Sequence, residues 1–301
     1  MLKNWKTSPK IALTALVGIT AIWGWTFLIV QHAVSRMPVM DFLSARFVVA
    51  ALVMIALRPK CLSNMSRQGF RQGIILGIML GLAYITQTYG LTSVSATVSG
   101  FITGLYVVLT PVVSWLILRR KITGFTWWAA VLACIGLALL SLHGWSLGIG
   151  ELLTLGCALF CALHIIGLGE WSARHDIYGL AFIQIATVAV ISLAAALPGG
   201  IILPPDAVVW GIVGVTAVFA TAVAFIVQTW VQSLVPATPA AVVMTMEPVF
   251  AGVFGVLVGG NRLTVRIIIG AVCVLTAMIM IQMKTVKGGS AQERLSLKQK
   301  D

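Results

Sequence analysis

The sequence predicts an all-α membrane protein whose ten transmembrane helices form two inverted repeats of five. Three observations lead to this prediction: an apolar composition, ten apolar runs of membrane-spanning length, and a similarity between the two halves of the chain. Of the 301 residues, 59% are hydrophobic and 9% are charged, and the mean hydropathy is +1.03. A soluble domain carries roughly 25% charged residues, so water is not the main solvent of this chain.

The apolar runs end where proline, glycine and charged residues cluster. A helix that crosses the bilayer needs about 20 apolar residues, and each run approaches that length. The first run begins after Lys10 and is too long for a signal peptide. The expected spans are residues 11–31, 40–57, 73–90, 96–118, 124–142, 148–168, 177–197, 207–230, 237–259 and 264–283.

Lysine and arginine lie at the ends of these runs, so the net charge of +12 does not indicate a nucleic-acid partner. Both termini and the connections on their side hold 16 of the 20 Lys and Arg residues. Short cytoplasmic loops retain positive charge, and both termini are therefore expected in the cytoplasm. The five cysteines show no disulfide spacing and are interpreted as reduced packing residues.

The two halves are similar without gaps when residue i is compared with residue i+141. Gln87 and Thr88 match Gln228 and Thr229, and 13 of the 49 positions from 83 to 131 are identical. Polar identities inside apolar runs weigh most, because composition alone does not produce them. Halves of five helices must enter the membrane in opposite senses, and such inverted repeats are typical of secondary transporters.

The predicted domains are a first repeat at residues 1–145, a second repeat at 146–285 and a polar cytoplasmic tail at 286–301. The first two spans of each half do not align convincingly, so there the repeat is an extrapolation.

Two prolines are candidate structural or gating positions. Pro111 in the fourth span and Pro248 in the ninth each remove a backbone donor and disturb the carbonyl four residues earlier, at Val107 and Met244. Interrupted helices near the midplane form the binding sites of many transporters. A simple packing kink is the alternative.

Glu247 and Arg46 are ionisable groups inside apolar spans, where charge is costly. Glu247 is a candidate for binding a proton or a substrate amine, and the alternative is a structural ion pair with Arg46. Arg46 is assigned a structural or gating role, although its guanidinium would also suit a substrate carboxylate or phosphate.

Aromatic and amide side chains inside apolar helices are candidate cavity walls and substrate-binding residues. Interhelical hydrogen bonding is the alternative for the glutamines. These candidates are Tyr84, Gln87, Tyr106, Gln228 and Trp230.

His164 is a further candidate substrate-binding residue. It shares a helical face with Cys157 and Cys161, which resembles half of a metal site. No second cluster of ligands accompanies it, so we predict no metal and no cofactor. Catalytic and nucleotide-binding motifs are also absent from the sequence, which argues against an enzyme or an ATP-driven pump.

The chain resembles the EamA family of the drug/metabolite transporter superfamily. The resemblance lies in residues 90–111 (GLTSVSATVSGFITGLYVVLTP), in Met246–Gly252 (MEPVFAG), in Trp23-Gly24 and in Ala45-Arg46-Phe47. It implies two inverted five-helix repeats around a cavity lined chiefly by the third, fourth, eighth and ninth spans. Asn261-Arg262 departs from the family, which often has an acidic residue before the Leu-Thr that opens the last span.

The resemblance also implies export of amino acids or related metabolites from a bacterial inner membrane. The sequence thus predicts alternating access around a central cavity, with a small-molecule substrate, membrane lipid and a candidate proton as partners, in a monomer or homodimer. Two alternatives remain open at this point: transport of other metabolites or drugs, and a lipid-interacting or receptor-like bundle that transports nothing.

Overall fold

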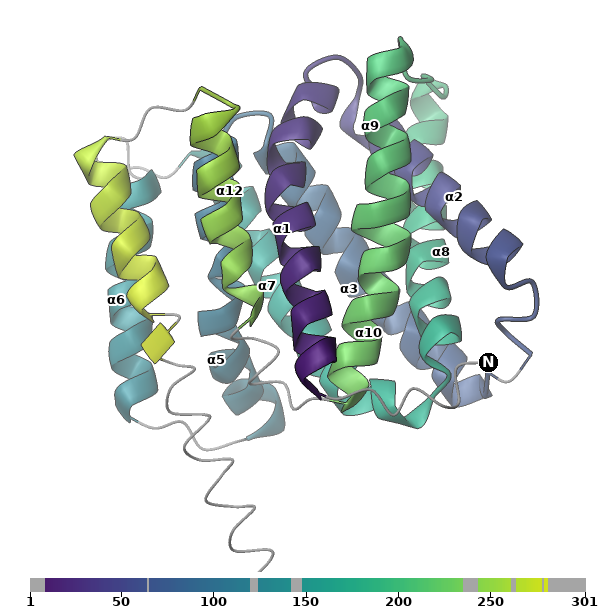
Figure 1. Ribbon diagram of the computed structural model, residues 1–301, viewed down its shortest axis with the longest axis horizontal. Coiled ribbons are helices and arrows are strands. Elements are labelled where there is room, and N and C mark those ends of the chain that lie inside the picture. Colours follow the sequence, from purple (N-terminus) through teal and green to yellow (C-terminus); the bar gives the residue numbers. More distant parts are fainter. Residues whose placement is uncertain are drawn as a thin grey trace, which may run out of the picture.

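The computed structural model describes residues 9–63, 65–119, 124–141, 148–234, 243–260, 264–277 and 279–280. Every regular element within these ranges is a helix, and Figure 1 shows them side by side in one bundle. The prediction of an all-α protein is therefore confirmed for this part of the chain. The predicted tail at 286–301 lies outside the described residues.

The elements follow one another with short connections. In chain order they are α1 (Pro9–Val34), α2 (Val39–Leu57), α3 (Arg67–Gly90), α4 (Ala96–Gly104), α5 (Tyr106–Leu118), α6 (Gly124–Ser141), α7 (Ile149–Trp171), η2 (Ser172–Arg174), α8 (Ile177–Ala196), η3 (Leu197–Gly199), α9 (Ala207–Ala217), η4 (Val218–Val223), α10 (Ala224–Leu234) and α12 (Met246–Leu257).

Seven helical segments are long and apolar enough to cross a membrane. They are Ile11–Val34, Val39–Leu57, Arg67–Gly90, Ala96–Ile117, Ile149–Arg174, Ile177–Gly199 and Ala207–Leu234. Three shorter apolar helices accompany them, at Trp127–Gly136, Met246–Leu257 and Val265–Ala277. The chain is therefore a multi-pass membrane protein.

Helix starts depend on capping side chains, which hydropathy does not reveal. The third span begins at Arg67 and not at residue 73, because the Ser66 hydroxyl accepts a hydrogen bond from the Gly69 N–H and satisfies the first turn. Asp176 caps α8 in the same way through the Gly179 N–H, at 2.7 Å.

Three spans are interrupted within the bundle. The fourth breaks at Leu105, between α4 and α5, and the eighth contains the π-helical turn η4. The helix α12 begins after a turn at Thr245 and has Pro248 in its first turn, whereas Pro111 lies inside α5. Pro248 has no N–H to bond the Met244 carbonyl, so that carbonyl needs another donor.

Helix contacts between the two halves occur in reciprocal sets. The helix α1 packs on α10 and α12, and its counterpart α7 packs on α3, α4 and α5. The helix α2 packs against its own counterpart α8, and α4 packs against α12. Such reciprocity is what a two-fold relation between equivalent halves produces.

Glycines permit the closest of these approaches. A methyl group added at Gly24 of α1 would lie 2.5 Å from the Phe250 Cβ and 2.8 Å from the Ala251 backbone nitrogen of α12. One added at Gly100 of α4 would lie 2.5 Å from the Ala251 Cβ. The helix α12 is thus held between α1 and α4 by contacts that leave no room for a side chain.

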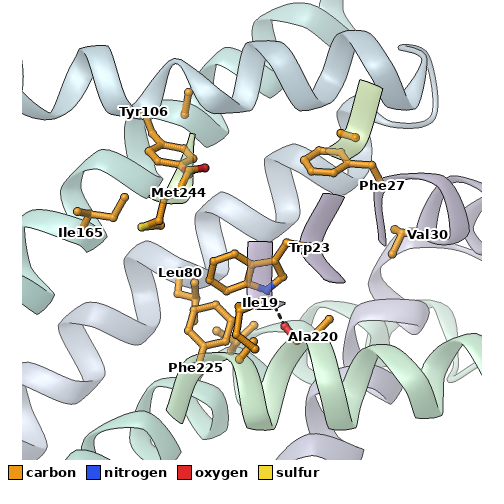
Figure 2. Close-up of a cluster of buried hydrophobic side chains, with 14 of the residues drawn as sticks. Ile19, Trp23, Phe27, Val30, Leu80, Tyr106, Ile165, Ala220, Phe225 and Met244 are labelled. Atoms are coloured by element: carbon orange, nitrogen blue, oxygen red, sulfur yellow. Dashed lines mark hydrogen bonds between the residues drawn. The ribbon is translucent and has the colours of Figure 1, made fainter. Parts of the chain in front are cut away.

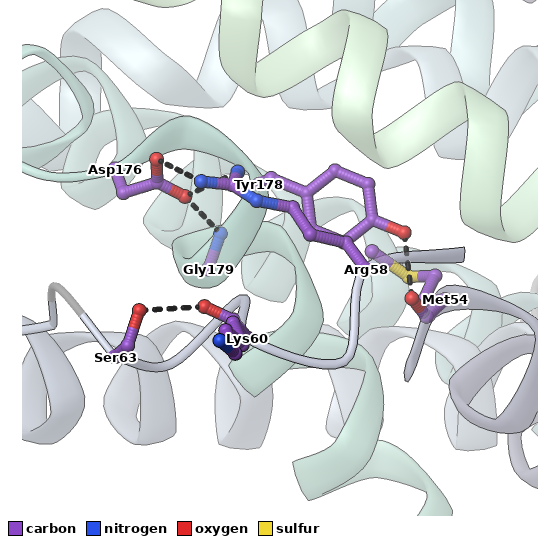
Figure 3. Close-up of polar contacts among 7 residues, drawn as sticks. All are labelled: Met54, Arg58, Lys60, Ser63, Asp176, Tyr178 and Gly179. Carbon is purple, nitrogen blue, oxygen red and sulfur yellow. Dashed lines mark hydrogen bonds and ion pairs between the residues drawn. The ribbon is translucent and has the colours of Figure 1, made fainter. Parts of the chain in front are cut away.

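Within the described part of the chain, two ion pairs join the halves, at opposite ends of the bundle. Arg58 donates to both carboxylate oxygens of Asp176, at 3.0 and 3.1 Å, and its guanidinium lies 5.4 Å from the centroid of the Tyr178 ring (Figure 3). At the other end, Arg36 after α1 pairs with Asp206, which caps α9. Each aspartate therefore both caps a helix and binds the other half.

We expect Gly24→Ala to lower the stability of the protein by about 1–3 kcal/mol, the usual cost of overpacking. Gly18→Ala is the matched control, because Gly18 lies on the same helix and has no atom within 4 Å of the added methyl group. Thermal unfolding of both variants in detergent measures the difference. Equal melting temperatures would contradict this account of the α1–α12 contact.

Asp206 gives the folded state a dependence on acid pH. The Val209 backbone N–H, together with Arg36, holds the pKa of this exposed carboxyl below its usual range. Its stabilising effect is therefore complete above the unfolded-state pKa of about 4 and is lost as the pH falls through the lower folded-state pKa.

We expect Asp206→Asn, which still caps the helix, to show a smaller drop in melting temperature on acidification than the unmodified protein. Melting curves at neutral and acid pH measure both drops. An identical drop in the variant would mean that other carboxyl groups account for the acid sensitivity.

Candidate functional site

A cavity lies among α1, α3, α4, α5, α7, α10 and the start of α12. Trp23 is near the middle of the first span and Tyr106 is near the middle of the fourth. Water-sized molecules have about 70 Å³ available here, and one water needs roughly 10–15 Å³ by this kind of measure. The cavity therefore has room for a few waters.

Tyr106 and Glu247 meet at the wall of this cavity. The Tyr106 hydroxyl lies 3.1 Å from the Glu247 Oε2 atom and 3.1 Å from the Met244 carbonyl oxygen. It thus offers its single proton to the carbonyl that Pro248 leaves without a donor and to the neighbouring carboxylate. Both side chains are buried, with exposed fractions of 2% and 7%.

Trp23 and Phe225 form the opposite, aromatic part of the wall. The Trp23 indole Nε1 donates to the Ala220 carbonyl at 2.9 Å, and the Trp23 and Phe225 ring centroids are 5.7 Å apart (Figure 2). Ala220 lies in the π-helical turn η4, where the altered backbone pattern leaves carbonyls open to other donors. The irregular turn therefore fixes the position of the indole ring.

The two glutamines predicted to line a cavity both do so. Gln87 donates from Nε2 to the Thr103 hydroxyl at 3.4 Å. Gln228 is 2% exposed, and its Oε1 atom has no hydrogen-bond partner among the described residues. A buried amide oxygen without a donor is costly, so a hydrogen-bond donor that entered the cavity would stabilise the Gln228 oxygen.

His164 lines the cavity and is held from behind by α8. Its Nε2 atom lies 2.7 Å from the Gln184 Oε1, while the Gln184 Nε2 donates to the Leu180 carbonyl. Since the Gln184 amide nitrogen is already used, its oxygen accepts and the His164 Nε2–H is the donor. The imidazole is therefore oriented by an uncharged partner.

Arg46 lies behind the cavity wall and is not among the lining residues. Its Nε donates to the Thr221 hydroxyl at 2.9 Å, and its guanidinium lies 4.7 Å from the centroid of the Tyr84 ring. Among the described residues it forms no ion pair with Glu247, whose partner is Tyr106. The alternative of an Arg46–Glu247 pair is thus not what the structure contains.

Many lining residues are separated by the repeat distance of 141. Two such pairs touch: Tyr106 hydrogen-bonds Glu247, and the rings of Tyr84 and Phe225 are 6.1 Å apart. Three more pairs line the cavity, namely Gln87 and Gln228, Thr103 and Met244, and Trp23 and His164. A residue that contacts its own counterpart lies on the axis relating the two halves, and the cavity therefore surrounds that axis.

Six of the predicted substrate-binding residues come together at this cavity, and one does not. Those that line it are Tyr84, Gln87, Tyr106, His164, Gln228 and Glu247. Trp230 is buried on α10 but is not a lining residue, which corrects its placement at the cavity wall. Two residues along a helix amount to roughly 200° of rotation, so Trp230 points away from the face of Gln228.

Sequence reasoning missed the aromatic and sulfur-containing part of the wall. Trp23, Phe27 and Phe225 line the cavity, as do Cys157 and Cys161, which were interpreted as packing residues. The repeat distance was the available signal, because it pairs Trp23 with His164 and Phe225 with Tyr84. Within the described part of the chain, no three His, Cys, Asp or Glu side chains are grouped to hold a metal ion.

Comparison with known protein families identifies the family of this chain. The model of the EamA-like transporter family matches twice, at residues 10–142 and 148–283. The chain belongs to the EamA-like transporter family. It is therefore a membrane transporter built from two EamA repeats.

Individual relatives agree with the EamA assignment. An uncharacterized transporter of Archaeoglobus fulgidus is 34% identical over 280 residues, which cover 91% of this chain and 85% of that protein. The uncharacterized transporter YoaV of Bacillus subtilis is 22% identical over 291 residues, 89% of this chain and 95% of that one. A crystal structure with 17% identity has a TM-score of 0.65 over 93% of this chain and 99% of its own, which shows a shared fold.

We expect Tyr106→Phe to cost about 1–3 kcal/mol of stability, because it leaves the buried Met244 carbonyl and Glu247 carboxyl without their common donor. Tyr89→Phe is the matched control, since Tyr89 is 40% exposed and also lies within the apolar spans. Thermal unfolding of both variants tests this. A Tyr106→Phe variant as stable as the control would mean that water replaces the hydroxyl.

Proposed function

We propose that this chain is a secondary transporter that exports small metabolites, with amino acids as the proposed substrate class, by alternating access. The observation that carries the proposal is the central cavity, many of whose lining residues come in equivalent pairs from the two halves. Aromatic and amide groups of such a wall suit small amphiphilic solutes, in which apolar surface and a few polar groups are combined.

The proposed topology has ten transmembrane helices in two inverted sets of five. In support, the seven long spans and the three shorter apolar helices correspond in order to the ten apolar runs of the sequence. The contacts between counterpart residues Tyr106 and Glu247, and between Tyr84 and Phe225, agree with a two-fold relation of the halves. Inverted repeats of this kind place the substrate site at their interface.

In the proposed mechanism the two halves rock about the cavity and open it to each side in turn. The available space of about 70 Å³ is too small for an amino acid, so binding requires side chains or helices to move apart. The helix breaks at Leu105, at η4 and before Met246 lie beside the cavity. Such breaks are where a span can bend with little loss of hydrogen bonding.

Glu247 is the proposed coupling residue. It is the one carboxyl group among the lining residues and it is 7% exposed. A carboxyl group in such a place is stable when it is protonated or when a cation lies beside it. A proton and a substrate amine would therefore compete for the same oxygen atoms, which is a sufficient basis for exchange.

The proposed location is the bacterial inner membrane, with both termini in the cytoplasm. This orientation is supported by the excess of lysine and arginine on the side of the termini. It places the Arg58–Asp176 pair at the cytoplasmic end and the Arg36–Asp206 pair at the periplasmic end.

We expect purified protein in proteoliposomes to catalyse saturable counterflow of one or more amino acids in a radiolabelled panel. Glu247→Gln should lower this flux at least tenfold or remove its response to a pH gradient, because the variant cannot exchange a proton. The matched control is Glu170→Gln, the same chemical change at the end of α7, outside the cavity. Unchanged flux and unchanged pH response in Glu247→Gln would refute the coupling role.

A further inference from the structure

We propose that the central cavity binds its substrate as an organic cation, with an ammonium group held between the Glu247 carboxylate, the Gln228 Oε1 atom and the aromatic rings. This inference rests on the proposed function, because it names the substrate class of the same cavity. It goes further in predicting which charge state of a solute is recognised and which is rejected.

The charges at the cavity wall favour a cation. Glu247 is the one carboxyl group of the lining, and no lysine or arginine belongs to it among the described residues. Its hydrogen-bond partner Tyr106 is an uncharged donor that is shared with the Met244 carbonyl. A buried carboxylate is stabilised most by a cation in direct contact, and the protein itself supplies none at this position.

The hydrogen-bonding groups lead to the same conclusion. The Tyr106 hydroxyl has one proton for two acceptors, Met244 and Glu247, so one of these acceptors always lacks it. The Gln228 Oε1 has no partner among the described residues. The Met244–Glu247 pair and Gln228 therefore each present an acceptor that a donor from the substrate can satisfy. An ammonium group carries three donors and no acceptor, whereas a carboxylate or phosphate only adds further acceptors.

The aromatic rings are a third, independent contribution. At the wall, the ring centroids of Trp23 and Phe225 are 5.7 Å apart, and those of Tyr84 and Phe225 are 6.1 Å apart. The faces of such rings attract cations within about 6 Å, indole most strongly. The protein uses this attraction elsewhere, since the Arg58 guanidinium lies 5.4 Å from the centroid of the Tyr178 ring and the Arg46 guanidinium lies 4.7 Å from that of Tyr84, behind the cavity wall.

Arg46 would favour a substrate anion if its guanidinium group lined the cavity. It is held by Thr221 and Tyr84 and is not part of the lining. A substrate carboxylate inside the cavity would therefore contact no cationic side chain, and it would lie close to Glu247. A solute with a free amine and a masked carboxyl group should fit better than the corresponding zwitterion, and an anion should fit worst.

Three solutes of nearly equal size test the charge preference: phenylalaninamide as the cation, phenylalanine as the zwitterion and 3-phenyllactate as the anion. Isothermal titration calorimetry on the purified full-length protein in detergent at neutral pH measures each affinity. We expect the amide to bind about ten- to hundredfold more tightly than the anion, the range for a charge-assisted hydrogen bond. Absence of binding by the amide, or equal binding of the amide and the anion, overturns the inference.

The same titrations on two variants assign the preference to one side chain. Glu247→Gln should bring the three affinities to within a few-fold of one another, while Glu247→Asp should keep their order because it keeps the charge. A preference that survives Glu247→Gln would refute the assignment to this carboxylate.

Cys161 supplies a second measurement that needs no bound solute and leaves Glu247 unchanged. It lines the cavity and is partly exposed, so it can be the single thiol of a variant in which Cys61, Cys134, Cys157 and Cys273 are alanine. A trimethylammonium-bearing methanethiosulfonate should modify it faster than a sulfonate-bearing one, after both rates are divided by those for a small thiol in solution. A ratio of one or less would overturn the inference.

These results separate the inference from the function on which it rests. Cation-selective binding without counterflow of any tested solute would contradict the transport proposal and support the cation site. Counterflow that prefers the anion 3-phenyllactate would support the transport proposal and refute the cation site.

Discussion

The constraint on which this structure depends is that polar backbone groups inside apolar spans must find partners within the protein. Three spans break beside the cavity, and side chains from other helices satisfy two of the released carbonyls: Tyr106 for Met244 and Trp23 for Ala220. Both donors are also cavity walls. The irregular backbone and the cavity wall are therefore one feature, because the rings that complete the hydrogen bonding also line the cavity.

The two repeats contribute equivalent positions to the cavity but different side chains at those positions. Its position follows from equivalence, since Tyr106 and Glu247 occupy corresponding positions of the two EamA repeats and meet at their interface. Its chemistry depends on the difference between the two side chains, since one repeat supplies a phenol and the other a carboxyl group. Two identical carboxyl groups at this contact would repel each other, whereas the phenol donates a hydrogen bond to the carboxylate.

Sequence patterns predicted helix positions well, because a membrane helix must be apolar over its whole length. They predicted polar wall residues such as Gln228 and Glu247 for the same reason, since each interrupts an apolar run. Trp23 and Phe225 could not be recognised in this way, because an aromatic residue that packs and one that lines a cavity look alike in sequence. The start of α3 was misplaced because Ser66 acts through geometry and not through hydropathy.

The two ion pairs that join the halves have an unequal distribution of charge. In both, the arginine comes from the first EamA repeat and the aspartate comes from the second. At the repeat distance of 141 the counterparts of Asp176 and Asp206 are Ser35 and Met65, so a first repeat facing a copy of itself would lack the aspartates, and a second repeat facing its own copy would lack the arginines. The two repeats are therefore complementary in charge at these contacts, and a copy of one repeat could not replace the other without losing both ion pairs.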